Sequence, residues 1–209
     1  MNKNNIFWVS YSDLMSSLFF VMLVLFVVTV GLLRHTVVTT KEQLEKIEEL
    51  QTAVQKLPAS YFEYQPEYKR FKLNRSIQFE RGSSEIDQKD HGYLLNVGRS
   101  ITKLITELQE NPEFQKFNIK YLVVIEGMAS KDTYNRNFEL SYERALSLYR
   151  LWDYEGIYFD PAFCEIQISG SGTAGIREYS GADEKYNQQF LIHIIPKMGR
   201  IQDDLAKEL

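Results

Sequence analysis

A charge-free apolar run near the start of the chain constrains this sequence more than any other feature. From Leu14 to Leu33 the sequence reads LMSSLFFVMLVLFVVTVGLL, and none of these 20 residues carries a charge. At about 1.5 Å per residue, such a helix is about 30 Å long, the thickness of the hydrocarbon core of a bilayer. Because the run is apolar on all sides of a helix, it fits a membrane span better than a core helix of a soluble protein. We therefore expect one transmembrane helix.

The alternative is a secretory signal peptide. Such peptides have a basic start, a shorter apolar stretch and a cleavage site of small residues. Here the start is nearly neutral, Asp13 stands at the edge of the apolar run, and the following GLLRHTVVTT offers no A-x-A pattern. Phe7, Trp8 and Tyr11 precede the run, as expected of an aromatic belt at a membrane interface. These features favour a retained anchor.

The rest of the composition indicates a folded domain and argues against several classes of function. The chain has 209 residues with 13 Tyr and 13 Phe, which is enough for a sizeable core. A net charge of −4 argues against a nucleic-acid binder, which is normally basic. The single cysteine, Cys164, excludes an internal disulfide and a cysteine-based zinc site, and three scattered histidines form no metal motif. No nucleophile with a base and no phosphate loop is visible, so we expect no enzyme, no catalytic residue and no cofactor.

Composition divides the chain into five segments. These are a tip with the membrane helix at 1–35, a polar helical linker at 36–58, an aromatic connector at 59–72, a folded domain at 73–198 and a polar tail at 199–209.

Five apolar residues of the linker recur at helical spacing: Leu44, Ile47, Leu50, Val54 and Leu57. Such a narrow stripe suits pairing with one partner helix, such as its own copy in a parallel dimer. A solvated helix with incidental leucines fits equally well, and Pro58 would end the helix in both cases.

Patterns in residues 73–198 predict alternating strands and helices. Strands are expected at 75–79, 121–126, 163–168 and 189–195, and helices at 92–108 and 140–152. Gly82 to Ser84 marks a turn, residues 170–181 form a glycine-rich loop, and Pro196 would close the last strand. This order predicts an α/β sandwich with helices on one face of a mixed sheet.

Asp13 is the residue of the membrane segment that most needs explanation, because ionisable groups in spans are costly and mark ion or proton pathways. If the helix begins near Ile6, Asp13 lies about two turns inside it, with Ser16 and Ser17 beside it on the same face. A carboxylate flanked by hydroxyls suits a proton or a partly hydrated sodium ion. If the helix begins at Asp13, the residue is only an N-cap. Both interpretations stay open at this point.

The segment FWVSYSDLMSS, from Phe7 to Ser17, resembles the signature of the stator B subunit family of the MotB/ZorB type. That family includes the flagellar motor B protein and the B subunit of the Zorya anti-phage system, and the Phe-Trp start is closer to the Zorya form. In this family the matching aspartate carries the ion, so the resemblance implies that role for Asp13, with Ser16 and Ser17 beside it. It also implies a homodimer inside a ring of a multi-span MotA/ZorA-like partner, driven by protons or by sodium.

The folded domain resembles the OmpA-like peptidoglycan-binding domain, the usual C-terminal companion of this membrane motif. The resemblance rests on the segments 77–79 (IQF), 82–86 (GSSEI), 124–127 (VIEG) and 140–145 (LSYERA), which occur in the expected order.

Some residues of the wall-binding site that this resemblance implies match the family pattern, and others depart from it. Arg144 matches the ligand-gripping arginine, and Asn135 falls in the Tyr-Asn pair before the helix. Ser130 stands where the family has an aspartate, and Asp132 could substitute if the loop turns it inward. Residues 187–189 read Asn-Gln-Gln where Asn-Arg-Arg is common. The resemblance thus implies a peptidoglycan site at Ser130, Asp132, Asn135 and Arg144, with weak or altered binding.

A wall-binding domain lies outside the cytoplasm, so the resemblance implies a single-pass protein of the bacterial inner membrane with a cytoplasmic N-terminus and a periplasmic C-terminal domain. The charges that flank the span do not fix this orientation by themselves. The implied function is an ion-conducting stator of a membrane motor, first in anti-phage defence and alternatively in flagellar motility. The competing interpretation is a passive tether between membrane and peptidoglycan, with Asp13 as a helix cap.

Overall fold

The computed structural model of the chain describes residues 3–115 and 119–198. The chain divides into two compact units, Met1–Glu48 and Glu49–Leu209. The polar tail expected at 199–209 lies outside the described residues.

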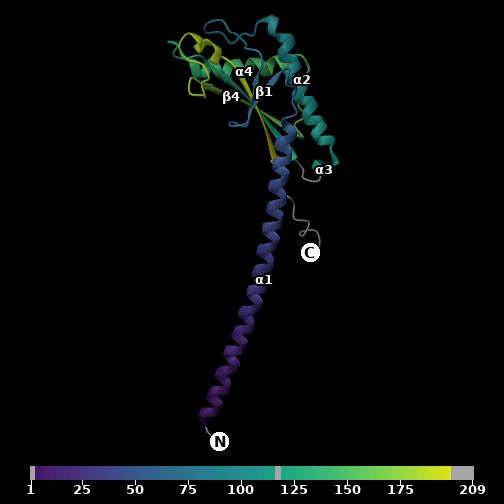
Figure 1. The fold of residues 1–209 in the computed structure, drawn as a ribbon, viewed down its shortest axis with the longest axis vertical. Coiled ribbons are helices and arrows are strands. Elements are labelled where there is room, and N and C mark those ends of the chain that lie inside the picture. Colours follow the sequence, from purple (N-terminus) through teal and green to yellow (C-terminus); the bar gives the residue numbers. More distant parts are fainter. Residues whose placement is uncertain (1–2, 116–118, 199–209) are drawn as a thin grey trace. The chain divides into compact units, whose positions relative to one another are not determined.

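A single helix, α1 (Lys3–Val54), makes up the described part of the first unit (Figure 1). Its section Trp8–Val38 is the one helix among the described residues that is long and apolar enough to cross a membrane, and none of its most apolar stretch is buried. The helix begins ten residues before Asp13. The end of α1, from Glu49 to Val54, belongs to the second unit.

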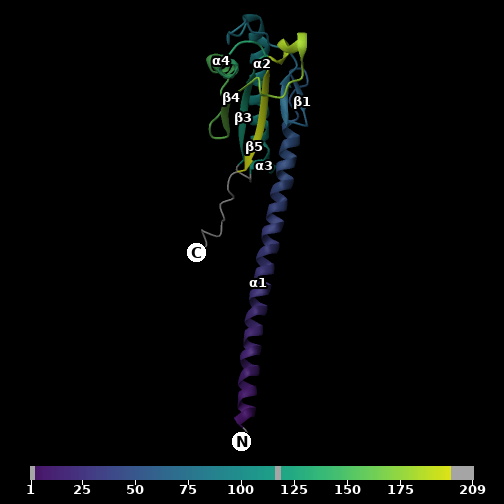
Figure 2. The ribbon, with the colours of Figure 1, turned by 90° about the vertical axis from the view of Figure 1, so that its left-hand side faces the viewer.

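The second unit is built around a five-stranded sheet with the strand order β1-β2-β5-β3-β4 (Figure 1). The strands are β1 (Phe62–Gln65), β2 (Arg70–Leu73), β3 (Ile119–Met128), β4 (Cys164–Gly172) and β5 (Phe190–Met198). β3 and β4 run parallel, whereas the other neighbours run antiparallel. β3 and β5 pair along their whole common length and lie side by side in Figure 2.

Two long helices cover one face of this sheet. The helices of the unit are α2 (Gln88–Glu110), α3 (Pro112–Gln115), α4 (Asn137–Tyr154) and the short 3-10 helix η1 (Gly181–Asn187). Alternate side chains of β3, such as Tyr121, Val123 and Ile125, join the buried residues of α2 and α4 in one core cluster. The side chains between them on β3 are more exposed. The expected mixed sheet with helices on one face is confirmed.

The N-terminal strands of the sheet lie where the sequence predicts a connector. Residues 59–72 contain β1 and most of β2, and Phe62 pairs with Leu73 in an antiparallel hairpin. The strand predicted at 75–79 is wrong, because this segment has no strand ladder. Ile77 is the buried residue of this segment, only 1% exposed and part of the core.

Pro196 does not close the last strand, since β5 continues to Met198. Pro196 pairs with Tyr121 of β3, but the Tyr121 N–H donates to Phe163 O, on the β4 side. The nitrogen of Pro196 therefore points away from β3, past the end of the β2 ladder at Ile192. A proline costs no ladder hydrogen bond at such a position.

The C-terminal part of the linker's apolar stripe packs inside the second unit. Leu50, Val54 and Leu57 are at most 7% exposed and belong to the core cluster. Leu44, by contrast, is 56% exposed. The interpretation of the whole stripe as a dimer seam is therefore wrong from Leu50 onward, because these side chains are already buried against their own sheet and helices.

Candidate functional site

Asp13 lies in the interior of α1. The ten residues between the start of the helix and Asp13 correspond to about 15 Å along the axis. An N-cap residue stands at the boundary of a helix with a non-helical backbone, whereas Asp13 has helical residues on both sides. The interpretation of Asp13 as a helix cap is therefore wrong.

The two serines near Asp13 bond to the helix backbone and not to the carboxylate. The Ser17 hydroxyl donates to the Asp13 carbonyl at 2.9 Å, and the Ser16 hydroxyl donates to the Ser12 carbonyl at 2.8 Å. Each hydroxyl oxygen keeps its lone pairs for an outside group. The Asp13 side chain is exposed and has no hydrogen-bond or ion-pair partner within the described residues. α1 thus presents a carboxylate and two hydroxyls that any bound group could reach.

In the second unit, Arg144 is a buried cation, and one of its guanidinium nitrogens has no hydrogen-bond partner. It lies on α4 and is only 1% exposed. Its Nε–H donates to Ser83 O at 3.0 Å, and its guanidinium lies 4.4 Å from the ring centre of Phe79. The NH1 nitrogen is buried without a hydrogen-bond partner. Burial lowers the pKa of Arg144 to about 10, against the opposing effect of the Asp132 charge. Such a group gains strongly from an incoming anion.

Asp132 lies close enough to Arg144 for their charges to interact. Its Oδ1 accepts from the Tyr134 N–H at 2.9 Å and from the Asn137 side chain at 3.1 Å. Partial burial raises the pKa of Asp132, but these hydrogen bonds and the charges of Arg81 and Arg144 outweigh it and lower the pKa below its ordinary value. The two charges thus influence each other, with Arg144 buried and Asp132 exposed at the surface.

Asn135 and Asn137 have different roles in this loop. Asn135, the residue predicted from sequence, is exposed. Asn137 is 8% exposed, and its amide donates to both Asp132 and the carbonyl of Tyr134. Asn137 was not predicted from the sequence, because its contacts depend on how the loop before α4 folds.

Ser130 is occupied by a contact within the chain. Its hydroxyl accepts from the Gln188 side-chain amide at 2.8 Å, and the residue is 8% exposed. The two positions that lack the expected acid and the expected base are thus in direct contact as a neutral pair. Asn187 beside them is fully buried and bonds the backbone of Glu178 and Tyr179. Among the four predicted wall-binding residues, Asp132 and Arg144 are near enough for their charges to interact. Ser130 is bonded to Gln188, and Asn135 is exposed.

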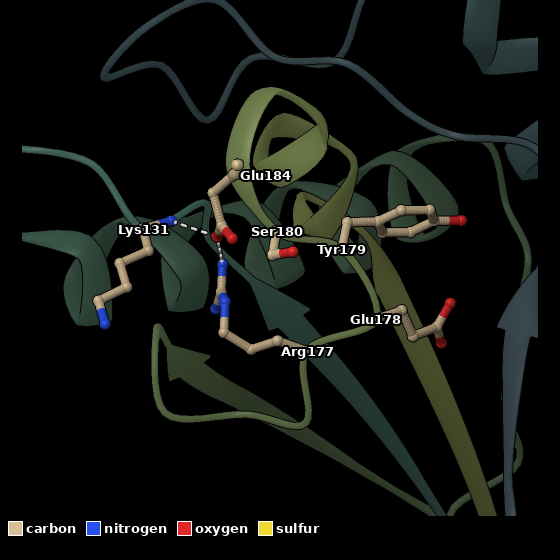
Figure 3. Close-up of a pocket in the computed structure, with 7 residues that line it drawn as sticks. Lys131, Arg177, Glu178, Tyr179, Ser180 and Glu184 are labelled. Atoms are coloured by element: carbon tan, nitrogen blue, oxygen red, sulfur yellow. Dashed lines mark hydrogen bonds and ion pairs between the residues drawn. The ribbon is translucent and has the colours of Figure 1, made fainter.

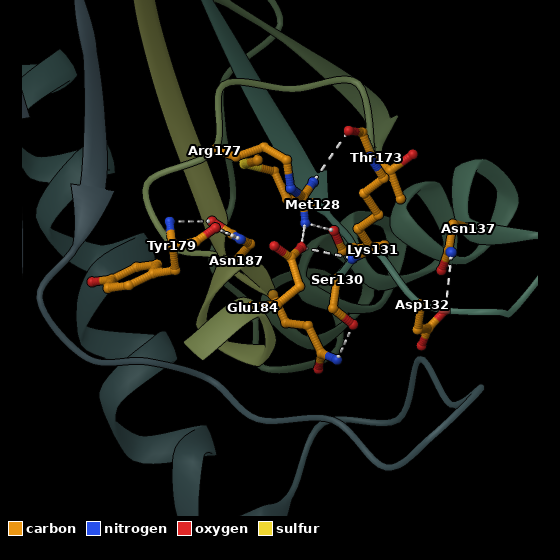
Figure 4. A network of polar contacts seen from close by, with 12 residues as sticks. Met128, Ser130, Lys131, Asp132, Asn137, Thr173, Arg177, Tyr179, Glu184 and Asn187 are labelled. Carbon is orange, nitrogen blue, oxygen red and sulfur yellow. Dashed lines mark hydrogen bonds and ion pairs between the residues drawn. The ribbon is translucent and has the colours of Figure 1, made fainter. Parts of the chain in front are cut away.

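Two glycines allow α4 to lie directly on the sheet beside this site. A Cβ on Gly127 would come within 2.0 Å of the Ser141 carbonyl oxygen, and one on Gly170 within 2.4 Å of the Tyr142 nitrogen. This close approach brings the start of α4 to the loop after β3, where Asp132 lies (Figure 4).

A pocket of about 670 Å³ adjoins the contacts of Arg144. Phe79 and Ser83, which both contact Arg144, line it together with residues up to His91. No group of three or more metal-binding side chains occurs in the described part of the chain. The site therefore offers charged and polar groups beside an open pocket and suits binding.

Comparisons with known proteins give matches only among solved structures. No family model and no curated protein matches the chain. The chain is similar to the periplasmic domain of Helicobacter pylori MotB at 14% identity, covering 66% of this chain and 80% of that one, with a TM-score of 0.40.

Two further structures are similar at the same level. One is an outer membrane protein from Borrelia burgdorferi B31, at 18% identity, covering 65% of this chain and 98% of that one, with a TM-score of 0.43. The other is the peptidoglycan-associated lipoprotein from Burkholderia pseudomallei, at 16% identity, covering 59% and 91%, with a TM-score of 0.38.

Proposed function

We propose that this chain is the ion-carrying stator subunit of a membrane motor, with Asp13 as the ion carrier and the second unit as its anchor at the cell wall. In this proposal two copies of the chain stand inside a ring of a multi-span partner in the bacterial inner membrane. The second unit lies in the periplasm.

The observation that carries the proposal is the place of Asp13 within α1. A carboxylate inside an exposed apolar helix has no structural use that a neutral residue could not fill better. The cap, which is the structural alternative, is excluded by the ten helical residues before Asp13. Protonation removes the charge of such a carboxylate and deprotonation restores it, which would change its contacts with a surrounding ring at each step. One elementary charge that crosses the membrane releases about 2.3 kcal/mol per 100 mV, which is enough to drive stepwise motion.

The anchoring role is supported by the charge pair of the second unit. Arg144 has a buried nitrogen without a partner and Asp132 carries a charge nearby, so the pair suits a ligand with both a carboxylate and an ammonium group. Free ends of wall stem peptides carry such groups. The neutral Ser130–Gln188 pair supports an altered recognition of the wall.

Within this class we place the chain in anti-phage defence, because the membrane motif of residues 7–17 is closer to the Zorya form than to the flagellar form. Flagellar motility is the second candidate.

Replacement of Asp13 by Asn tests the ion-carrier proposal. Asn has the same shape as Asp but cannot carry a charge, so we expect complete loss of proton or sodium uptake by vesicles that contain the chain and its ring partner. Asp13→Glu is the matched variant and should retain part of the uptake. A passive tether predicts that both variants behave as the unchanged chain does.

The same variants separate defence from motility. In cells with the complete system, Asp13→Asn should raise phage plaque counts to those of cells without the system. A loss of swimming with unchanged plaque counts would instead place the motor in motility.

A further inference from the structure

We propose that Arg177 and Glu184 form a positioning pair that fixes the backbone of residues 128–132 and so places Asp132 for its ligand. This inference rests on the proposed contact with the cell wall. Arg177 lies in the loop after β4, and Glu184 lies on η1. Neither residue is singled out by its sequence context.

The pair holds both peptide groups that flank Ser130. Arg177 NH2 donates to the carbonyl of Ala129 at 3.0 Å, and Glu184 Oε1 accepts from the N–H of Lys131 at 2.7 Å. The two side chains also form an ion pair with each other (Figures 3 and 4). One connected set of contacts thus spans the loop from residue 129 to residue 131.

Backbone hydrogen bonds fix the residues of the loop that precede Ser130. The N–H of Met128 donates to Gln189 O at 3.0 Å, and the N–H of Ala129 donates to Gly172 O at 3.0 Å. Arg177 NH1 donates to Thr173 O at 3.2 Å, which ties the pair to the end of β4. The carbonyl of Ala129 and the N–H of Lys131 are the groups that depend on the Arg177–Glu184 pair.

Asp132 follows directly after the last residue that the pair holds. On its other side, Asp132 is fixed by Tyr134 and Asn137 at the start of α4. The loop is therefore held at two ends by different elements, one being the Arg177–Glu184 pair and the other α4. If the Arg177–Glu184 pair is lost, the backbone of residues 129–131 is free to move while Asp132 stays bonded to the start of α4. The position of the Asp132 carboxylate relative to Arg144 would then change.

The location of the pair indicates positioning more than support of the fold. Arg177 and Glu184 are each 19% exposed and line an open pocket at the surface (Figure 3). Neither belongs to the hydrophobic core cluster. A change in this pair therefore leaves the core untouched, whereas a small displacement of a binding group costs considerable affinity.

The test compares Glu184→Ala, Glu184→Gln and Lys197→Met in the full chain in detergent micelles. Lys197 forms a 2.7 Å ion pair with Glu165 between β5 and β4, so its variant also removes one ion pair from the same sheet. Three quantities are measured: the hydrogen-exchange rate of the Lys131 amide, the carboxyl titration of Asp132 by NMR, and the affinity for a soluble muropeptide with its stem peptide.

For Glu184→Ala we expect about tenfold faster exchange of the Lys131 amide, because its acceptor is gone. The Asp132 titration should shift, and the muropeptide affinity should fall about tenfold in a unit that stays folded, because the hydrophobic core is untouched. Glu184→Gln keeps an acceptor oxygen and should lie between Glu184→Ala and the unchanged chain. Lys197→Met should change none of the three quantities.

The inference is overturned if Glu184→Ala leaves the Lys131 exchange rate and the Asp132 titration unchanged. It is also overturned if Lys197→Met weakens muropeptide binding as much as Glu184→Ala does. If the unchanged chain binds no muropeptide, the proposed wall contact fails, while the exchange rate and the titration still decide whether the pair positions Asp132.

Discussion

The helix around Asp13 and the loop around Asp132 hold their carboxylates in opposite ways. Near Asp13, the serine hydroxyls bond to carbonyls four residues back along the same helix. Near Asp132, the contacts join distant parts of the chain, such as Glu184 with Lys131 and Arg144 with Ser83. The first site needs only a helix, whereas the second exists only when the whole unit is folded.

Because of this difference, substitutions at the two sites should affect ion transport and the stability of the fold differently. A change at Asp13 removes no tertiary contact within the described residues, so it should alter ion transport without altering unfolding. A change in the second unit acts on both, in proportions that depend on the residue.

Gly127→Ala should unfold the second unit. The added Cβ would lie 2.0 Å from the Ser141 carbonyl oxygen, and backbone atoms of a helix cannot move aside cheaply. We expect a loss of about 3 kcal/mol or more in the free energy of unfolding, measured by urea denaturation. Gly31→Ala in α1 is the matched control, because a Cβ there meets nothing within 4 Å. Equal effects of the two variants would contradict the contrast between the regions.

Arg144→Met should weaken wall binding strongly while the unit stays folded. The substitution removes the cation that the ligand needs, but it also removes a buried nitrogen without a partner. We expect about a hundredfold loss of muropeptide affinity, since a buried charge-assisted contact contributes about 2–3 kcal/mol. The free energy of unfolding should change by only about 1 kcal/mol. Binding that survives in Arg144→Met would remove Arg144 from the site.

The sequence predicts the membrane helix and most of the second unit because their signals are local. The apolar run and the period of the helical and strand patterns lie within short windows. The strands β1 (FEYQ) and β2 (RFKL) do alternate apolar and polar residues, but each is only four residues long, so the pattern does not stand out from the aromatic and charged residues around it. The sequence leaves open whether the linker leucines face a partner helix or solvent, because such a stripe does not reveal which surface covers it.

The two candidate sites also differ in how much of each can be predicted from local sequence. Asp13 is visible in the sequence, although only the helix start at Lys3 excludes the cap. The Ser130–Gln188 contact joins residues 58 positions apart, and no local pattern reveals it. The same holds for Glu184, which reaches Lys131 across 53 positions. Contacts of this length depend on the order of strands in the sheet, which periodicity alone does not determine.

The charge of Asp132 should make a small contribution that depends on pH. Because the folded pKa lies below the ordinary value, the stabilisation is present above the unfolded pKa and is lost as the pH falls through the folded pKa. The difference in melting temperature between the unchanged chain and Asp132→Asn should therefore be constant at neutral pH and vanish in strong acid. Asn137→Ala removes one hydrogen bond to the carboxylate and should raise the NMR titration midpoint of Asp132. An unchanged midpoint would mean that the Asn137 amide does not stabilise the charged Asp132 carboxylate.

Ser17→Ala should have the smallest effect and tests whether Asp13 acts alone. The hydroxyl donates to the Asp13 carbonyl, so its loss leaves the carboxylate in place and weakens the helix little, if at all. If the hydroxyl oxygen only assists the ion, uptake should fall by a factor of about 5, which corresponds to about 1 kcal/mol. Thr29→Ala, which removes a similar bond to Leu25 farther along the helix, should leave uptake unchanged. If Ser17→Ala abolishes uptake as Asp13→Asn does, the ion site requires a precise arrangement of several groups, and the helix then resembles the second unit in this respect.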